Sequence, residues 1–186
     1  MHAVVVLLDR VHAHSVEQLW EELEARFGVR RVQEVPLPHL SLQGFRSYDP
    51  ERMVFGLERL ASRHAFRVHA HGYGFFSGQT DECLTLHVPL VRTEELSALH
   101  GAVRGELTCA GQATDGFYEP QNWSPHVTIA DRDLTPRLLG EIAHWLATRP
   151  HHSWTIGIDN LSLVHDDGVA RTLRHQVRLK RGERAG

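Results

Sequence analysis

The stretches PHLSLQGF, residues 38–45, and SPHVTIAD, residues 124–131, contain the same four-residue pattern of His, an apolar residue, Ser or Thr, and a second apolar residue. Successive side chains of a β-strand point to opposite faces, so the His and the hydroxyl residue of each pattern share one face. The two aliphatic residues of each pattern point the other way. Each motif therefore predicts a strand that anchors itself in a core and presents an imidazole and a hydroxyl on its opposite side. These residues are His39, Leu40, Ser41 and Leu42 in the first motif, and His126, Val127, Thr128 and Ile129 in the second.

The order of elements around the two motifs is repeated. Apolar periodicity, capping residues and turn residues predict strand, helix, motif strand, helix and strand in each half of the chain. In the first half these are strand 3–9, helix 15–27, the first motif strand, a helix that begins at Asp49-Pro50, and strand 66–76. Helix 15–27 has Ser15 as its N-cap, Gln18 at the capping-box position and Gly28 at its end. In the second half they are strand 84–90, a helix capped by Thr93, the second motif strand, a helix that begins at Thr135-Pro136, and strands around 153–164 and 171–179.

This duplicated order predicts an α+β protein with two similar lobes related by a pseudo-twofold axis. Each lobe is expected to hold an antiparallel-rich sheet backed by two helices, with a central groove between the lobes. Residues 1–180 then form one domain made of two sequence halves, about 1–80 and 81–180, and residues 181–186 form a frayed tail.

The bulk composition is that of an ordinary globular protein, with 41% hydrophobic and 23% charged residues. A formal net charge of −3 argues against a large electrostatic footprint for long nucleic acid, but it allows a nucleotide or an RNA end as the partner. Cys83 and Cys109 form no CxxC pattern, which favours reduced thiols and a cytoplasmic location. The apolar run Ala3–Leu8 is too short for a signal peptide or a membrane span, so no membrane partner is expected. A monomer is favoured, with the oligomeric state left open.

Two imidazoles on opposite sides of one reacting centre suit acid–base chemistry near neutral pH. The unperturbed pKa of His, about 6.5, allows neutral and protonated forms to coexist there. One ring can then act as base and the other as acid in a single turnover. The two hydroxyls, Ser41 and Thr128, can hold the oxygens of a phosphate as negative charge grows in the transition state.

The motifs His39-Leu40-Ser41-Leu42 and His126-Val127-Thr128-Ile129 resemble the H-x-[ST]-x motifs of the 2H phosphoesterase superfamily. Within it the chain is most similar to bacterial proteins called the 2′-5′ RNA ligase family or RNA 2′,3′-cyclic phosphodiesterases. The resemblance covers nearly the whole chain. It implies a bilobal fold with both histidines in a central groove, and metal-independent hydrolysis or transfer at a 2′-linked or 2′,3′-cyclic phosphate, which leaves a 2′-phosphate in the hydrolytic relatives.

Further contacts follow if the motif strands continue their alternation. Gln43 and Phe45 would share the face of His39, with Phe45 as a base-stacking surface, and Arg132 would share the face of His126 as a phosphate contact. Relatives often carry Arg directly after the stretch HVTLA, whereas here Asp131 intervenes between HVTIA, residues 126–130, and Arg132. Tyr118 and Trp123 precede the second motif and either flank a nucleobase or pack within their loop.

A metal or cofactor is not expected. His69 and His71 share a strand face, but no third ligand is evident in the sequence. Three functions stay open: hydrolysis of a 2′,3′-cyclic phosphate, action on another phosphodiester such as a 2′-5′ linkage, including ligation, and nucleotide or RNA binding without turnover. The sequence does not decide which His is acid and which is base.

Overall fold

The computed structural model describes residues 2–30, 37–77, 84–114, 116–131, 133–149, 153–166 and 171–181. Its helices are α1 (Arg10–Phe27), α2 (Pro50–Leu60), α3 (Glu94–Leu107) and α4 (Pro136–Ala147). Its strands are β1 (His2–Leu7), β2 (His39–Tyr48), β3 (Phe66–His71), β4 (Gly74–Phe76), β5 (Thr85–Pro89), β6 (Gly111–Ala113), β7 (His126–Asp131), β8 (Ser153–Ile158), β9 (Asn160–Asp166) and β10 (Arg171–Arg178).

The two motif strands lie side by side in the middle of an eight-stranded sheet. The strand order is β10-β9-β1-β2-β7-β5-β4, and β6 pairs with β2. Neighbouring strands of this sheet are antiparallel, and so is the separate two-stranded ribbon of β3 and β8. Motif strands β2 and β7 are joined through the pair Leu40 and Val127.

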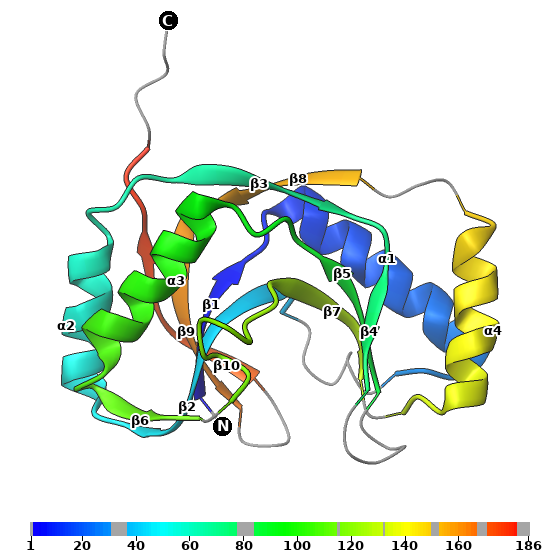
Figure 1. Ribbon diagram of the computed structural model, residues 1–186, viewed down its shortest axis with the longest axis horizontal. Helices are drawn as coiled ribbons and strands as arrows, with labels where there is room; N and C mark the ends of the chain where they lie inside the picture. The colour runs from blue at the N-terminus through cyan, green and yellow to red at the C-terminus, as the bar shows by residue number, and fades with distance from the viewer. Residues whose placement is uncertain are drawn as a thin grey trace, which may run out of the picture.

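Each half of the sheet has its own pair of helices. α2 and α3 pack together, with α3 against β2 and α2 against β10, whereas α1 packs against β7 and α4 (Figure 1). The β3–β8 ribbon runs across the molecule between the two helix pairs (Figure 1). The fold is therefore α+β with two related lobes, as the sequence predicts. Each helix pair combines one helix from the first half of the chain with one from the second. The division into sequence halves at about residue 80 stays a prediction.

Three of the four helix starts agree with the sequence prediction. The side chains of Asp49, Thr93 and Thr135 each accept a hydrogen bond from the backbone N–H three residues later. Pro follows directly after Asp49 and after Thr135, where its missing N–H costs no helical hydrogen bond. These starts were predictable because an N-cap acts within one turn of its own helix.

The predicted start of α1 at Ser15 is wrong. The helix begins at Arg10, and Asp9 is its N-cap, because the Asp9 carboxylate accepts hydrogen bonds from the N–H groups of Val11 and His12 at 3.0 and 3.1 Å. Ser15 lies inside the helix, where its hydroxyl donates to Val11 O, so the capping box proposed with Gln18 does not exist. The C-terminus agrees with the prediction, since Gly28 has a φ of 72°.

The strand predicted over residues 66–76 is two strands. Gly72 has a φ of 71° and separates β3, which pairs with β8, from β4, which pairs with β5. The short strand β6 was not predicted. At the C-terminus, Lys180 is hydrogen-bonded through its backbone to Arg63 and Ala65. Residues 182–186, most of the predicted tail, lie outside the described residues.

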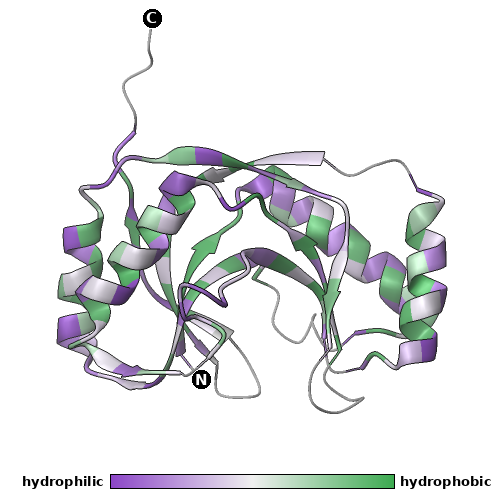
Figure 2. Cartoon of the chain, viewed as in Figure 1, coloured by the Kyte–Doolittle hydropathy of each residue, from purple (hydrophilic) through white to green (hydrophobic). Residues whose placement is uncertain are grey.

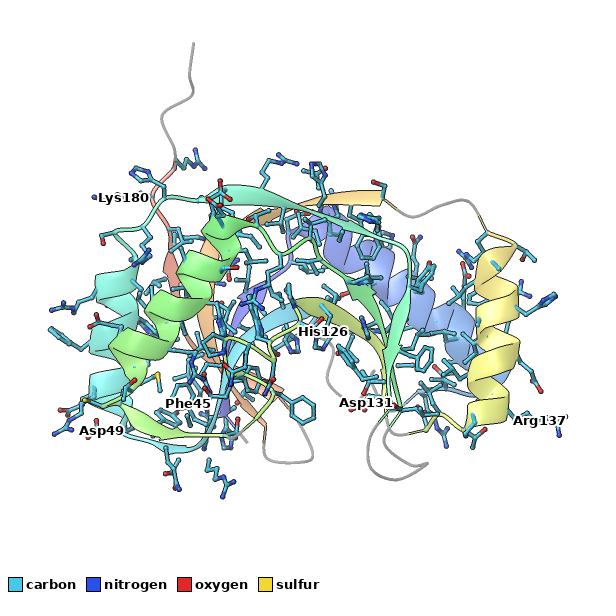
Figure 3. All side chains as sticks on the ribbon, viewed as in Figure 1. Phe45, Asp49, His126, Asp131, Arg137 and Lys180 are labelled. Carbon is cyan, nitrogen blue, oxygen red and sulfur yellow. The ribbon has the colours of Figure 1, made fainter. Side chains whose placement is uncertain are left out.

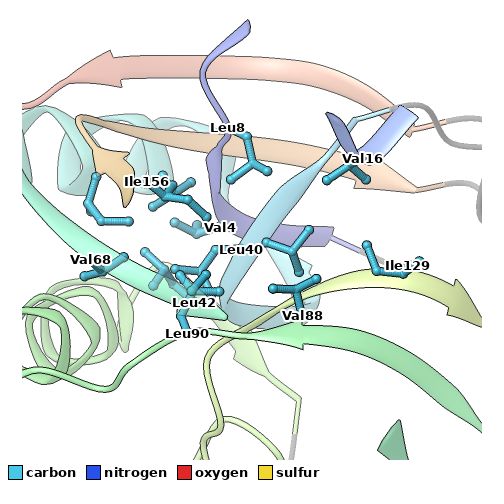
Figure 4. Packing of buried hydrophobic residues seen from close by; sticks show 14 of the residues in the cluster. Val4, Leu8, Val16, Leu40, Leu42, Val68, Val88, Leu90, Ile129 and Ile156 are labelled. Atoms are coloured by element: carbon cyan, nitrogen blue, oxygen red, sulfur yellow. The ribbon is translucent and has the colours of Figure 1, made fainter. Parts of the chain in front are cut away.

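One large core lies between the sheet, the helices and the β3–β8 ribbon. The aliphatic residues of both motifs belong to it, and Figure 4 shows Leu40, Leu42, Val88 and Ile129 converging from β2, β5 and β7. Figure 2 shows apolar residues concentrated in the central strands and forming stripes on the helices. Burying one such side chain contributes roughly 1.5–3 kcal/mol. The motif strands are thus among the best anchored parts of the molecule.

Candidate functional site

The polar residues of both motifs lie on one face of the eight-stranded sheet, which we call the motif face. They are half-buried, whereas the four aliphatic residues between and after them are no more than 1% exposed. The motif face carries His39 and Ser41 from β2, and His126 and Thr128 from β7. This is the alternation that the sequence predicts for both strands.

The register brings the two motifs together. Continuing the antiparallel pairing of Leu40 with Val127 by one residue in each direction places each histidine opposite the hydroxyl residue of the other motif. His39 and His126 are then diagonal neighbours, and such residues are about 7–8 Å apart in a regular antiparallel pair. The result is a two-by-two array in which imidazoles and hydroxyls alternate.

The two imidazoles have the same orientation relative to the backbone. Nδ1 of His39 lies 2.5 Å from Leu37 O, and Nδ1 of His126 lies 2.7 Å from Ser124 O. A carbonyl oxygen only accepts hydrogen bonds, so each Nδ1 carries a proton and donates it. Nε2 is therefore the ring nitrogen that exchanges a proton in both residues. It accepts a proton when the ring is neutral and donates one when the ring is charged.

The ring of His126 packs against two other rings, those of His87 in β5 and Phe76 in β4. Its ring is 5.1 Å from that of His87 and 4.9 Å from that of Phe76, measured between centroids, and Phe76 stacks on His87 at 4.1 Å. Burial lowers the pKa of His126, while the hydrogen bond to Ser124 O and the carboxylate of Asp131 act in the opposite direction. Burial thus favours the neutral ring.

His87 is a third histidine on the motif face, and it is not among the site residues predicted from the sequence. In β5 it pairs with Thr128 of β7, and only 4% of it is exposed. Burial, with a smaller effect from nearby His126, lowers the pKa of His87 to about 4. The alternation of Leu84, Leu86 and Val88 already places His87 on the opposite side of β5. What the sequence did not indicate is that β5 pairs with the second motif strand.

A bulge at the last residue of each motif reverses the alternation predicted for the residues beyond it. Along β2, Ser41 pairs with Val5 and Gln43 pairs with the adjacent Val4, so Leu42 is the extra residue. Along β7, the pairs of Thr128 with His87 and of Ala130 with Leu86 leave Ile129 as the extra residue. The bulges occupy the same position in the two motifs, which extends the internal symmetry to the backbone.

The bulge in β2 explains why Gln43 and Phe45 do not share the face of His39. Both are 1% exposed and line a cavity of about 250 Å³ that also includes Arg104 of α3. Gln43 Oε1 accepts a hydrogen bond from Arg104. Phe45 belongs to the core and offers no surface on which a base could stack, so that expectation is corrected.

The bulge in β7 likewise changes which residue follows the second motif on its face. Asp131 pairs with Thr85, two residues from His87, and accepts a hydrogen bond from the Thr85 hydroxyl at 3.1 Å. Arg132, the predicted phosphate contact, lies outside the described residues. Figure 3 shows His126 near the centre of the molecule, with Phe45 and Asp131 on opposite sides of it.

The two aromatic residues that precede the second motif have different neighbours: Tyr118 lies beside Gly44 of β2, and Trp123 lies against α3. A Cβ added to Gly44 would lie 3.0 Å from the Tyr118 ring, so the absence of a side chain at Gly44 gives the ring room over β2. Trp123 is 4% exposed and its ring stacks on His100 of α3. The structure thus supports packing, the second of the two roles considered for Trp123.

The comparison with protein families agrees with this arrangement. A family model described as the 2′-5′ RNA ligase superfamily matches residues 9–170. The chain belongs to this superfamily. Membership makes it one of a group of phosphoesterases and ligases, which indicates an enzyme.

Solved structures similar to this superfamily member share its fold over nearly their whole length. TT0787 of Thermus thermophilus is 17% identical, with a TM-score of 0.63 over 96% of this chain and 97% of that one. E. coli LigT complexed with ATP and with 3′-AMP is 16% and 13% identical, with TM-scores of 0.57 and 0.59 over 96% of both chains. No curated protein matches the chain. At these identities the structural likeness establishes the fold.

Two further features of this superfamily member concern metal binding and membrane insertion. Among the described residues, no group of three His, Cys, Asp or Glu side chains could hold a metal ion. His69 Nδ1 instead lies 3.2 Å from the Thr155 hydroxyl. Within the same described ranges, no helix is long and apolar enough to cross a membrane.

Proposed function

We propose that the protein hydrolyses a 2′,3′-cyclic phosphate, at an RNA end or on a small nucleotide, and leaves a 2′-phosphate. The observation that carries this proposal is the alternating array of two imidazoles and two hydroxyls, with both Nδ1 atoms bound to backbone carbonyls. The array offers two proton-transfer groups and two hydrogen-bond donors around one phosphorus atom. Membership of the 2′-5′ RNA ligase superfamily supports the reaction class.

We assign His126 as the base and His39 as the acid. The lowered pKa of His126 keeps its ring neutral at neutral pH, as a base requires. Nε2 of neutral His126 takes a proton from water, and the water oxygen forms a bond to phosphorus. The bond from phosphorus to O3′ breaks, and O3′ receives the proton of Nε2 of charged His39. Exchange with solvent then restores both rings.

The hydroxyls of Ser41 and Thr128 donate to the non-bridging oxygens of the phosphate. Their value is greatest when charge on those oxygens increases in the transition state. Phe76, beside His126, and Tyr118, beside Gly44 of β2, are candidates for contact with the base or ribose, and Arg132 remains a candidate phosphate contact. The nucleotide complexes of the structurally similar E. coli LigT support a nucleotide as ligand.

The net charge of −3 favours a nucleotide or a short RNA end over long RNA as the substrate. Both proton transfers come from side chains, so we expect activity without a divalent metal. The cytoplasmic location and the monomeric state expected from the sequence belong to the same proposal.

The test is hydrolysis of nucleoside 2′,3′-cyclic phosphates in the presence of EDTA, with phosphorus NMR to identify the product. We expect a 2′-phosphate, and we expect His39→Ala and His126→Ala each to lower kcat roughly 10²–10⁴-fold, because each removes one proton transfer. His144→Ala, on the exposed side of α4, is the matched control and retains wild-type kcat.

Three results would contradict the proposal: wild-type rates in both motif variants, a strict need for a divalent metal, or a 3′-phosphate product. Cleavage or joining of a 2′-5′-linked dinucleotide, with no action on cyclic phosphates, would favour the second function considered. Tight binding of 2′-phosphonucleotides without turnover would favour a binding module.

A further inference from the structure

Trp123 connects the two motifs, and the connection lies outside the reacting groups. Its indole Nε1 donates a hydrogen bond to Ser41 O at 3.1 Å, although the two residues are 82 positions apart. We propose that Trp123 is a positioning residue that holds the first motif strand at a set distance from His126. The effect that we expect Trp123 to have on catalysis rests on the proposed function. Its effect on the position of the first motif strand does not.

The registered pairing between the two motif strands is short. Within the part of the chain that the structure describes, β2 and β7 share one registered pair, Leu40 with Val127. By contrast, β1 pairs with β2 at six positions. A further link between the first motif strand and the segment that leads into β7 therefore adds to this pairing. The bond from Trp123 to Ser41 O is such a link.

Trp123 is itself held by α3 and by Arg92, which lies just before α3 in the chain. Its ring stacks on the ring of His100, with centroids 4.0 Å apart and planes at 2°. The guanidinium of Arg92 lies 5.6 Å from the ring centroid, and its Nη1 donates to Trp123 O at 3.0 Å. Burial lowers the pKa of His100 to about 4, so the stacked ring is neutral near pH 7. The indole thus has a fixed position from which to bind β2.

The backbone between Trp123 and His126 carries this position to the imidazole. Three successive carbonyls are bound: Trp123 O by Arg92, Ser124 O by His126 Nδ1, and Pro125 O by Leu90 N. Trp123 thus lies one residue from the carbonyl that orients the His126 ring. A displacement of about 1 Å at a reacting group can lower a rate by up to about 10²-fold, so a loosened indole has a measurable effect.

The test is Trp123→Phe, which keeps an aromatic ring against His100 and removes the donor to Ser41 O. Trp145→Phe is the matched control, because Trp145 lies on α4 and contacts Phe27 and Arg149 instead. The first readout is the dissociation constant for inorganic phosphate. It is measured from the NMR signals of the His39 and His126 rings. The second is kcat and KM for a nucleoside 2′,3′-cyclic phosphate.

In the wild type we expect both rings to report one dissociation constant for phosphate. Trp123→Phe is expected to weaken phosphate binding about 5- to 10-fold and to lower kcat about 10-fold with a smaller change in KM, since a positioning loss affects the transition state most. Trp145→Phe is expected to match the wild type in both readouts.

A second variant covers the case in which Trp123→Phe fails to fold. Arg92→Gln changes an exposed side chain and frees Trp123 O, so a smaller loss in the same direction is expected. Wild-type phosphate binding in Trp123→Phe, or in Arg92→Gln if the first variant is unfolded, overturns the proposal, as do equal losses in the Trp145 control. If the wild type binds phosphate but hydrolyses no cyclic phosphate, the proposed function fails while the phosphate readout still decides the role of Trp123. Absence of phosphate binding in the wild type overturns both.

Discussion

At the scale of single residues, His39 and His126 make the same hydrogen bond to the backbone but differ in their surroundings. The hydrogen bond from Nδ1 to the carbonyl two residues earlier is local, and it appears in both motifs. The rings of Phe76 and His87 come from other strands and are found beside His126. Two motifs of the same pattern therefore place their imidazoles in different surroundings, and surroundings are what distinguish the acid from the base in acid–base catalysis.

The surroundings of His126 predict the pH dependence of the reaction. A base must be neutral, and burial lowers the pKa of His126 from 6.5, so kcat/KM should rise with pH through a midpoint below 6.5 and be retained at neutral pH. Two other titratable groups lie near this ring: Asp131, which raises its pKa, and His87, which is neutral in this range. The measurement is kcat/KM between about pH 5 and pH 9, with circular dichroism to exclude unfolding.

Asp131→Asn provides an independent check of the same assignment. Removing the carboxylate removes an effect that raises the pKa of His126, so the ascending limb should move to lower pH. An ascending limb above pH 6.5 in the wild type, or an upward shift in Asp131→Asn, would show that His126 is not the base.

At the scale of secondary-structure elements, local signals were sufficient for some features and not for others. The starts of α2, α3 and α4 depend on a capping side chain within the first turn, and the sequence contains it. For α1 the apolar periodicity that begins at Val16 favoured Ser15 as the cap, whereas the helix begins earlier and is capped by Asp9. The bulges at Leu42 and Ile129 have no local signal, since they depend on the strands that pair with the motifs.

The row of residues across β4, β5 and β7 gives a prediction at this scale. Gly74 pairs with His87, and a Cβ at Gly74 would lie 2.7 Å from His87 Nε2. Gly74→Ala should therefore push the His87 ring toward His126, destabilise the fold by about 1–3 kcal/mol, and lower kcat. The measurements are a urea titration and the cyclic phosphate assay.

Gly157→Ala in β8 is the matched control, because a Cβ there would have no heavy atom within 4 Å. It is expected to change neither stability nor kcat appreciably. If Gly74→Ala were as active and as stable as this control, His87 would have room to move and would not form a rigid wall beside His126.

At the scale of the whole molecule, two buried histidines make stability depend on pH. Burial lowers the pKa of both His87 and His100 from 6.5 to about 4. In the unfolded chain these groups bind protons below pH 6.5, while in the folded protein they do not until about pH 4. The stability that they contribute is thus present above pH 6.5 and is lost as pH falls from 6.5 toward 4.

The expected loss is up to about 1.4 kcal/mol per pH unit for each histidine within that range. Urea unfolding at neutral and at mildly acidic pH measures it, with the midpoint falling as pH decreases. His100→Phe keeps the ring against Trp123 and removes one titrating group, so its midpoint should depend less on pH than that of the wild type. An equal pH dependence would mean that His100 is protonated in the folded protein.

The sequence by itself determined the twin motif strands, their buried aliphatic anchors, three of the four helix starts and the α+β class. These features follow from alternation along one strand or from contacts within one helical turn, so a short stretch of chain contains their cause. Only the tertiary structure decided that a bulge turns Gln43 and Phe45 away from His39, and that His87 and Phe76 lie beside His126. Only the tertiary structure also decided that Trp123 binds the backbone of Ser41. Each of these depends on which strand or loop becomes the neighbour, and that choice is made by packing between segments far apart in the sequence.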